Sequence, residues 1–241
     1  MIKETIDVQF ILNIIPKLVL EVPQTLLLAL CAIVLGMLAG LGLAWCKLCK
    51  YSLLRYSVNV ITVTMRGIPT VVMLFLVYFG LPIVLKQLGV DVSNWYKECF
   101  VVLALALELA VLTSEMFRSA YSGLDRGQLE AAHALGMSKL QRFYRVILPQ
   151  GFYIILPNIG SAVLSLVQGT ALAYTLGIID ITGRAMIIDT ETVQMKTLEA
   201  FIGVCLIYWL LSVGITYTFK HLEKYFGRGM KTMGTALEKE S

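Results

Sequence analysis

The sequence predicts an all-α integral membrane protein, and its composition is the first observation that supports this fold class. Its 241 residues are 58% hydrophobic and only 15% charged, with a mean hydropathy of +0.78. In soluble domains roughly a quarter of the residues are charged. Long apolar segments also recur along the whole chain, separated by short polar stretches. These observations exclude an ordinary soluble domain and predict one membrane domain.

Five apolar segments are long enough to be membrane spans, for which about 20 mainly apolar residues are needed. They are residues 22–45, 68–85, 100–117, 151–176 and 198–219. Residues 53–65, which precede the second segment, also have helical character. Together the two would exceed a bilayer at roughly 1.5 Å per residue. We therefore expect Gly67 and Pro69 to kink this stretch or to separate an interfacial turn from the span.

Basic residues follow the first, third and fifth predicted spans, whereas the other connections are acidic. The basic group after the first span consists of Lys47, Lys50, Arg55 and Arg66. The acidic residues of the other connections are Asp91, Glu98, Asp180, Asp189, Glu191 and Glu199. Cytoplasmic loops are enriched in Lys and Arg. This asymmetry predicts an outside N-terminus, a cytoplasmic C-terminus and a cytoplasmic position for residues 121–149.

The polar stretch DRGQLEAAHALGMSKLQRFYRVILPQ, residues 125–150, is predicted to form two short helices. Asp125 suits an N-cap, and Gln128 lies where a capping box places its second member. Gly136 suits the left-handed turn that ends the first helix. Ser138 and Gln141 repeat the capping pattern, and Pro149 closes the unit or begins the next span.

Small side chains give the first of these helices a surface suited to close docking. They are Ala131, Ala132 and Ala134. The alternative is a solvated linker whose basic residues lie near lipid headgroups. Since a short helix that enters a partner's groove benefits from small residues, we favour docking. His133 alone is more often a surface or packing residue than a switch.

Ordered motifs across most of the chain resemble those of the permease subunits of bacterial ABC importers for polar amino acids. The segments EAA at 130–132, Gly136 and ILP at 147–149 resemble the EAA loop of that family. RGIP at 66–69 with LFLVYFGLP at 74–82, SEMFR at 114–118 and GQLEAA at 127–132 resemble further family motifs. A lone EAA would be a weak signal, but these ordered blocks are specific.

The resemblance implies a type I ABC importer permease fold with about five transmembrane helices and a cytoplasmic coupling-helix loop. It implies a single permease domain over residues 1–241, with a core at about 22–220 and a coupling loop at 121–149. The residues expected to contact the ATPase are Glu130, Ala131, Ala132, His133, Leu135 and Gly136. It also implies a multi-pass location in the bacterial inner or plasma membrane.

The resemblance further implies partners: a second permease subunit (itself or a paralogue), two ATPase subunits, an extracellular or periplasmic amino-acid-binding protein, and membrane lipid, but no nucleic acid. ATP and Mg would belong to the ATPase, because the chain has no G-x-x-x-x-G-K-[ST] phosphate loop. No catalytic set is recognisable, so we expect no enzyme activity and no cofactor on this chain. Its only histidines are His133 and His221, and its five cysteines suit apolar packing, so no metal site is expected.

Candidate residues of the substrate path are polar groups within predicted spans, where a bilayer makes them costly. Glu108 and Glu115 are seven residues apart and share one helical face. Glu115 has an alternative role in an ion pair with Arg118. For Glu108, contact with a substrate or pore competes with contact to a partner subunit or a cation. The fourth span adds the polar residues Ser161, Ser165, Gln168 and Thr170, for which helix packing is an equally good explanation.

Three functions compete on this evidence. The favoured one is an importer permease that moves a polar amino acid into the cell, and the overall resemblance is greatest to permeases for cystine or related sulfur amino acids. A secondary transporter would commonly show paired repeats and interrupted helices, which are not recognisable in the sequence. A membrane anchor or receptor subunit would explain the spans but not the aligned glutamates. A stably bound ATPase would select the first function.

Overall fold

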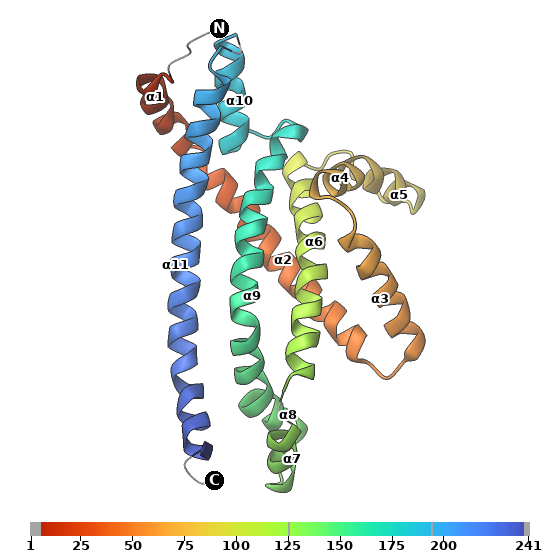
Figure 1. The fold of residues 1–241 in the computed structure, drawn as a ribbon. Helices are drawn as coiled ribbons and strands as arrows, with labels where there is room; N and C mark the ends of the chain where they lie inside the picture. The colour runs from red at the N-terminus through yellow and green to blue at the C-terminus, as the bar shows by residue number, and fades with distance from the viewer. Residues whose placement is uncertain (1–5, 125, 194, 239–241) are drawn as a thin grey trace.

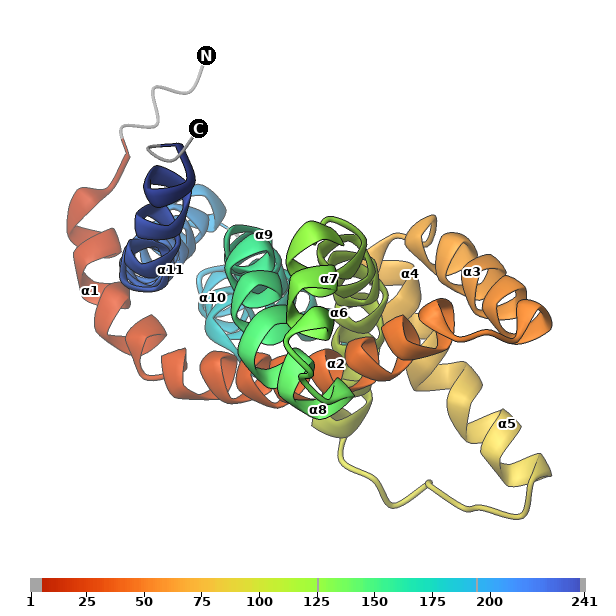
Figure 2. The same cartoon turned by 90° about the horizontal axis from the view of Figure 1, so that it is seen from below.

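The computed structural model describes residues 6–124, 126–193 and 195–238, and these residues fold into helices and short connections without a strand. Three long helices, α6 (Lys97–Ser122), α9 (Leu148–Gly169) and α11 (Thr197–Glu238), run along the long axis of the molecule (Figure 1). α2 (Val22–Leu48) crosses them obliquely, and the view from below shows it along one side of their row (Figure 2). The main hydrophobic core lies where these helices meet.

Five helical segments in the described part of the chain are long and apolar enough to cross a membrane. Their bounds are Val22–Leu48, Thr70–Gln87, Lys97–Ser122, Lys139–Leu176 and Thr197–Phe226. Each of the five expected spans overlaps one of these segments, so the predicted number is confirmed. The helices extend past the apolar windows at several ends because capping and tertiary packing, rather than apolar composition, decide where a helix stops.

The second span is broken where the sequence predicts. α3 (Ser52–Arg66) ends at Gly67, and α4 (Thr70–Phe75) begins after Pro69, which has an extended backbone. A π-helical turn, η1 (Leu76–Gly80), then leads into α5 (Leu81–Gln87). Figure 1 shows α3 and the α4–α5 segment pointing in different directions. Gly67 and Pro69 thus separate two helices instead of bending one.

Small residues bring α2 and α6 into close contact. A Cβ atom added at Gly36 would lie 2.9 Å from the Ala106 carbonyl oxygen and 2.9 Å from Leu109 Cβ. At Gly40 an added Cβ would meet the Thr113 side chain. Gly and Ala at a spacing of four residues allow two helix backbones to approach closely, which is the usual basis of packing between membrane helices. α2 and α6 therefore form one tightly packed pair.

The fourth span is longer than expected. α8 (Lys139–Arg142), the π-helical η2 (Phe143–Ile147), α9 and the 3₁₀-helical η3 (Thr170–Leu176) follow one another without a break. The helix that contains this span thus begins twelve residues before the apolar segment, which is expected to start at residue 151. Pro149 lies in the first turn of α9, directly after the π-helical turn η2.

Two short helices that the sequence analysis treats as connections or leaves unassigned lie at one end of the molecule. α1 (Val8–Val19) and α10 (Ile181–Glu191) pack with the start of α11 around a small second core. α7 (Arg126–Ala134) and α8 lie at the opposite end (Figure 1). We refer to these as the α10 end and the α7 end.

Candidate functional site

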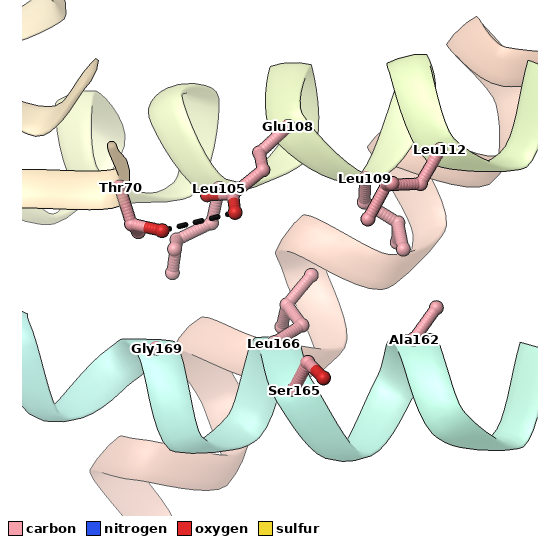
Figure 3. Close-up of a pocket in the computed structure, with 9 residues that line it drawn as sticks. All are labelled: Thr70, Leu105, Glu108, Leu109, Leu112, Ala162, Ser165, Leu166 and Gly169. Carbon is pink, nitrogen blue, oxygen red and sulfur yellow. Dashed lines mark hydrogen bonds between the residues drawn. The ribbon is translucent and has the colours of Figure 1, made fainter. Parts of the chain in front are cut away.

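Glu108 lies half-buried in α6 and faces α9 across a small cavity (Figure 3). Its Oε1 atom accepts a hydrogen bond of 2.9 Å from the Thr70 hydroxyl at the start of α4. The cavity has a volume of about 30 Å³, enough for a water molecule or two. Its other lining residues are Leu105, Leu109, Leu112, Ala162, Ser165, Leu166 and Gly169. A carboxylate and two hydroxyls therefore meet in a mainly apolar enclosure.

The Glu108 carboxylate has no cation within 4.0 Å in the part of the chain that the structure describes; the ion pairs there all involve other acidic residues. A carboxylate in a membrane span normally pairs with a cation or lines an aqueous path, because burial of an unpaired charge is costly. The site can therefore accept an ammonium or guanidinium group, or donors from a partner chain.

Ser165 is the second sequence-predicted residue on this cavity, and it faces Glu108 from α9 (Figure 3). Thr70 is a cavity residue that sequence reasoning missed. The available signal was a polar residue at the start of a predicted span: Thr70 directly follows Pro69, where α4 begins. The structure thus places Glu108, Ser165 and Thr70 around one cavity, and Thr70 comes from a segment 38 residues before Glu108.

The remaining polar residues of the fourth span lie apart from the cavity. The Ser161 hydroxyl donates to the Pro157 carbonyl oxygen at 3.3 Å, within α9. Gln168 Nε2 donates to Ser212 Oγ at 3.4 Å and so joins α9 to α11. Thr170 is fully buried and donates to the Val167 carbonyl oxygen at 2.7 Å. None of the three lines the cavity around Glu108.

Glu115 lies two turns beyond Glu108 on α6 and is fully engaged by cations. Its Oε2 atom is 2.9 Å from Arg118 Nε, the i,i+3 pair that the sequence offers as an alternative to substrate contact. Its Oε1 atom is 2.5 Å from Lys47 Nζ of α2, a partner that sequence reasoning missed because the two residues are 68 positions apart. Glu115 and Glu108 therefore have different surroundings although they share a helix.

The hairpin at the α7 end has the backbone that the sequence predicts. Gly136 has φ +72°, the left-handed conformation expected there. Its N–H donates to His133 O at 3.0 Å, and the Met137 N–H donates to Ala132 O at 3.2 Å, which is a Schellman ending. Ser138 and Gln141 form both hydrogen bonds of a capping box. The expected N-cap Asp125 lies outside the described residues.

Most residues predicted to contact an ATPase are exposed on this hairpin. Glu130, Ala131, His133, Leu135 and Gly136 are exposed, and Ala132 is buried beneath them. The Leu135 side chain is 77% exposed. Gln128 accepts a hydrogen bond from Gln150, which ties the first helix to the start of α9. The hairpin thus presents an exposed surface with small and apolar residues and is held to a span behind it.

A buried carboxylate at the α10 end also escaped the sequence analysis, which counts Asp180 only as an acidic loop residue. Asp180 caps α10 by accepting the Gly183 N–H at 2.8 Å, and it accepts the Tyr208 hydroxyl of α11 at 3.3 Å. Burial raises the pKa of Asp180 from its usual 3.8 to about 6. Asp180 links α10 to α11.

The fold and these sites define a transporter subunit of the membrane, and comparison with known proteins places it in one family. Residues 13–227 match the family described as "Binding-protein-dependent transport system inner membrane component". The chain belongs to this family and is a permease subunit of an amino-acid ABC importer. The resemblance to permeases for polar amino acids is confirmed.

Relatives and solved structures agree with this assignment over most of the chain. The probable amino-acid permease protein YxeN of Bacillus subtilis (strain 168) is 32% identical over 226 residues, covering 94% of this chain and 96% of the relative. The L-cystine transport system permease protein TcyL of the same organism is 28% identical over 236 residues, covering 98% of each. A crystal structure of an amino acid ABC transporter with histidines superposes with a TM-score of 0.77 at 27% identity, covering 92% of this chain and 99% of that one.

Proposed function

We propose that this permease moves a polar amino acid with a free ammonium group into the cell, and that Glu108 receives this group in transit. The carrying observation is the Glu108 carboxylate, which lies within a span, is hydrogen-bonded by Thr70 and has no cation within 4.0 Å in the described part of the chain. A cavity of about 30 Å³ is too small for an amino acid. Transit therefore requires α6 and α9 to separate.

We propose cystine or a related sulfur amino acid as the substrate. Two features support a zwitterion of this kind: the carboxylate at Glu108 and the mainly apolar walls beside it. TcyL, whose name is that of an L-cystine permease, matches 98% of this chain. Other similar proteins carry names for glutamine and arginine systems, so the transport assay must compare these substrates directly.

A second permease chain, either a copy or a close paralogue, completes the path in this proposal. Four polar residues of α9 at helical spacing are exposed: Asn158, Ser161, Ser165 and Gln168. Ser161 and Gln168 each have one hydrogen-bond partner within this chain. Lipid offers no partner to the other donors and acceptors of the stripe, whereas polar groups between helices can satisfy one another. Two permease chains that face each other through α9 would also enclose more of a path than five spans can.

Two ATPase subunits, which carry ATP and Mg, are proposed to bind the hairpin of α7 and α8 in each permease. The exposed Leu135 and the small Ala131 support docking of α7 into a groove. A binding protein would deliver the amino acid to the α10 end. In this arrangement the α7 end is cytoplasmic and the α10 end lies outside, and the exposed Lys139, Arg145 and Lys220 support that orientation.

The test is uptake into proteoliposomes that contain the permease, its ATPase and the binding protein. Radiolabelled cystine, glutamine and arginine are compared, with ATP inside or absent. We expect ATP-dependent accumulation of cystine above the other two. Uptake of another amino acid instead would contradict the proposed substrate but not the proposal that the complex is an importer. Accumulation without ATP would contradict the proposal of an ATP-driven importer.

A further inference from the structure

Lys47 is a buried ammonium group in the last turn of α2. Its side chain has 0% exposure, whereas Lys50, just beyond the end of α2, is exposed. Lys47 Nζ donates to Ser114 Oγ at 2.9 Å and to Glu115 Oε1 at 2.5 Å, and both acceptors belong to α6. One side chain therefore joins the ends of two spans through two polar contacts.

Stability alone does not explain this arrangement. Taking an ammonium and a carboxylate out of water costs about as much as their attraction returns, so that apolar replacements of similar size are often as stable. Apolar packing already holds the two helices together, since Gly36 and Gly40 admit close contact with α6. What Lys47 adds to such packing is a fixed alignment of the two helices, because its buried Nζ reaches Ser114 and Glu115 together only when the ends of α2 and α6 keep their relative position.

The pair lies between the cavity at Glu108 and the hairpin of α7 and α8. Glu108 is two helical turns before Glu115 on α6, and Arg118, held by the other oxygen of Glu115, is one turn before the helix ends at Ser122. Leu124 is then buried, and α7 begins at Arg126. A rotation of the end of α6 would move α7 relative to the cavity, and the Lys47 contact opposes that rotation.

We propose that Lys47 is a positioning residue that makes α2 and α6 move as one body. A displacement of α7 then moves the helices that form the cavity at Glu108. The proposal rests on the proposed function and concerns how the two sites are connected. Lys47 lies outside both the cavity at Glu108 and the hairpin of α7 and α8. Its loss should leave both sites formed but weaken the connection between them, so that ATP is hydrolysed without import.

The experiment measures ATP hydrolysed per amino acid imported in proteoliposomes containing the complete complex. Lys47→Met keeps an unbranched side chain without the ammonium group and leaves Glu115 paired with Arg118. We expect the ratio to rise at least about twofold, in line with other residues that connect distant sites. Lys47→Arg, which restores a cation, should return it towards the wild-type value. Lys50→Met, three residues further along the chain and exposed, should leave the ratio unchanged.

The outcomes separate the two proposals. Absence of ATP-driven import in the wild-type complex overturns the proposed function. Wild-type import combined with an unchanged ratio in Lys47→Met, or a raised ratio that Lys47→Arg fails to lower, overturns the positioning role alone. If Lys47→Met does not assemble, Lys47→Gln retains a hydrogen-bond donor for Ser114 without the charge, and an unchanged ratio in that variant has the same meaning.

Discussion

Glu108 and Glu115 show how far single residues could be interpreted from the sequence. Their spacing of seven correctly placed both on α6, and the pair of Glu115 with Arg118 was a stated alternative that the structure contains. The difference between them depends on Lys47 and Thr70, which come from other helices. A local pattern carries no information about contacts 38 and 68 residues away, so only the fold separates a paired carboxylate from one that can receive a substrate.

Replacing Glu108 by glutamine tests the site directly. Glu108→Gln keeps the shape and can still accept the Thr70 hydroxyl, but it removes the charge that attracts an ammonium group. We expect import to fall by about 10-fold or more, since a hydrogen bond to a charged group contributes about 1.5–3 kcal/mol. Uptake kinetics measure the effect, with Glu98→Gln at the start of α6 as the control. Wild-type kinetics in Glu108→Gln would reject the contact.

Asp180 provides a prediction of pH dependence. Its pKa is about 6 when folded and 3.8 ordinarily, so the folded protein binds the proton more tightly and stability falls as pH rises from about 4 to 6. Above pH 7 the buried, ionised Asp180 lowers the free energy of unfolding by on the order of 3 kcal/mol. Asp180→Asn retains an N-cap and removes the charge. Its melting temperature should exceed that of the wild type at pH 8 and differ less at pH 5; equal differences at both values would contradict the shifted pKa.

At the scale of elements, local signals predicted helix ends better than they predicted short helices. Gly67, Pro69 and Gly136 act through their own backbone, and Ser138 and Gln141 through side chains that bond to backbone three residues away. The structure has the expected break, turn and cap at these positions. α1 and α10 were missed because each has only 11 or 12 residues and is stabilised mainly by packing on α11. α1 carries a periodic signal that the sequence reasoning did not use, because its buried Ile11, Ile14 and Leu18 have helical spacing, whereas α10 has no clear apolar face.

The turn at Gly136 is expected to hold α7 in its orientation. A Cβ atom added at Gly136 would have no atom within 4 Å, so Gly136→Val causes no steric clash with other residues. It acts through the backbone, because φ +72° costs a β-branched residue about 1–3 kcal/mol of strain. We expect binding of the ATPase, or its stimulation by substrate, to decrease, and Glu130→Ala to have a milder effect. Pull-down measures binding of the ATPase, and receptor-stimulated ATP hydrolysis measures its stimulation.

Gly151→Val is the matched control for that turn. Gly151 also has open space around its Cβ position, but it lies within α9 and has no positive φ. The control should retain coupling. Wild-type coupling in Gly136→Val and Glu130→Ala would mean that the hairpin is only a linker.

At the scale of the whole molecule, the exposed polar stripe on α9 predicts the assembly. Native mass spectrometry of the detergent-solubilised complex should find two permease chains for each pair of ATPase subunits. In addition, Ser161→Cys in an otherwise cysteine-free chain should form a cross-link between permease subunits, because Ser161 lies on that stripe. A complex with one permease per ATPase pair would count against this assembly.

The orientation of the molecule is a separate prediction. Asn94 precedes α6 on the α10 side, and Lys139 lies in the hairpin at the other end; both are exposed. In intact cells a membrane-impermeant maleimide should label Asn94→Cys, whereas Lys139→Cys should react only after the membrane is opened. The reverse pattern would invert the topology.

The buried contact between Lys47 and Glu115 also has a consequence for biosynthesis. The ribosome completes α2 while Glu115, 68 residues further along, has not yet been made. An ammonium without its partner remains near the hydrated surface of the bilayer, because entry into the hydrocarbon is unfavourable. We therefore expect the end of α2 to settle only when α6 is inserted. A nascent chain released before α6 would carry an unpaired lysine, a feature by which the cell's quality control can recognise an unfinished permease.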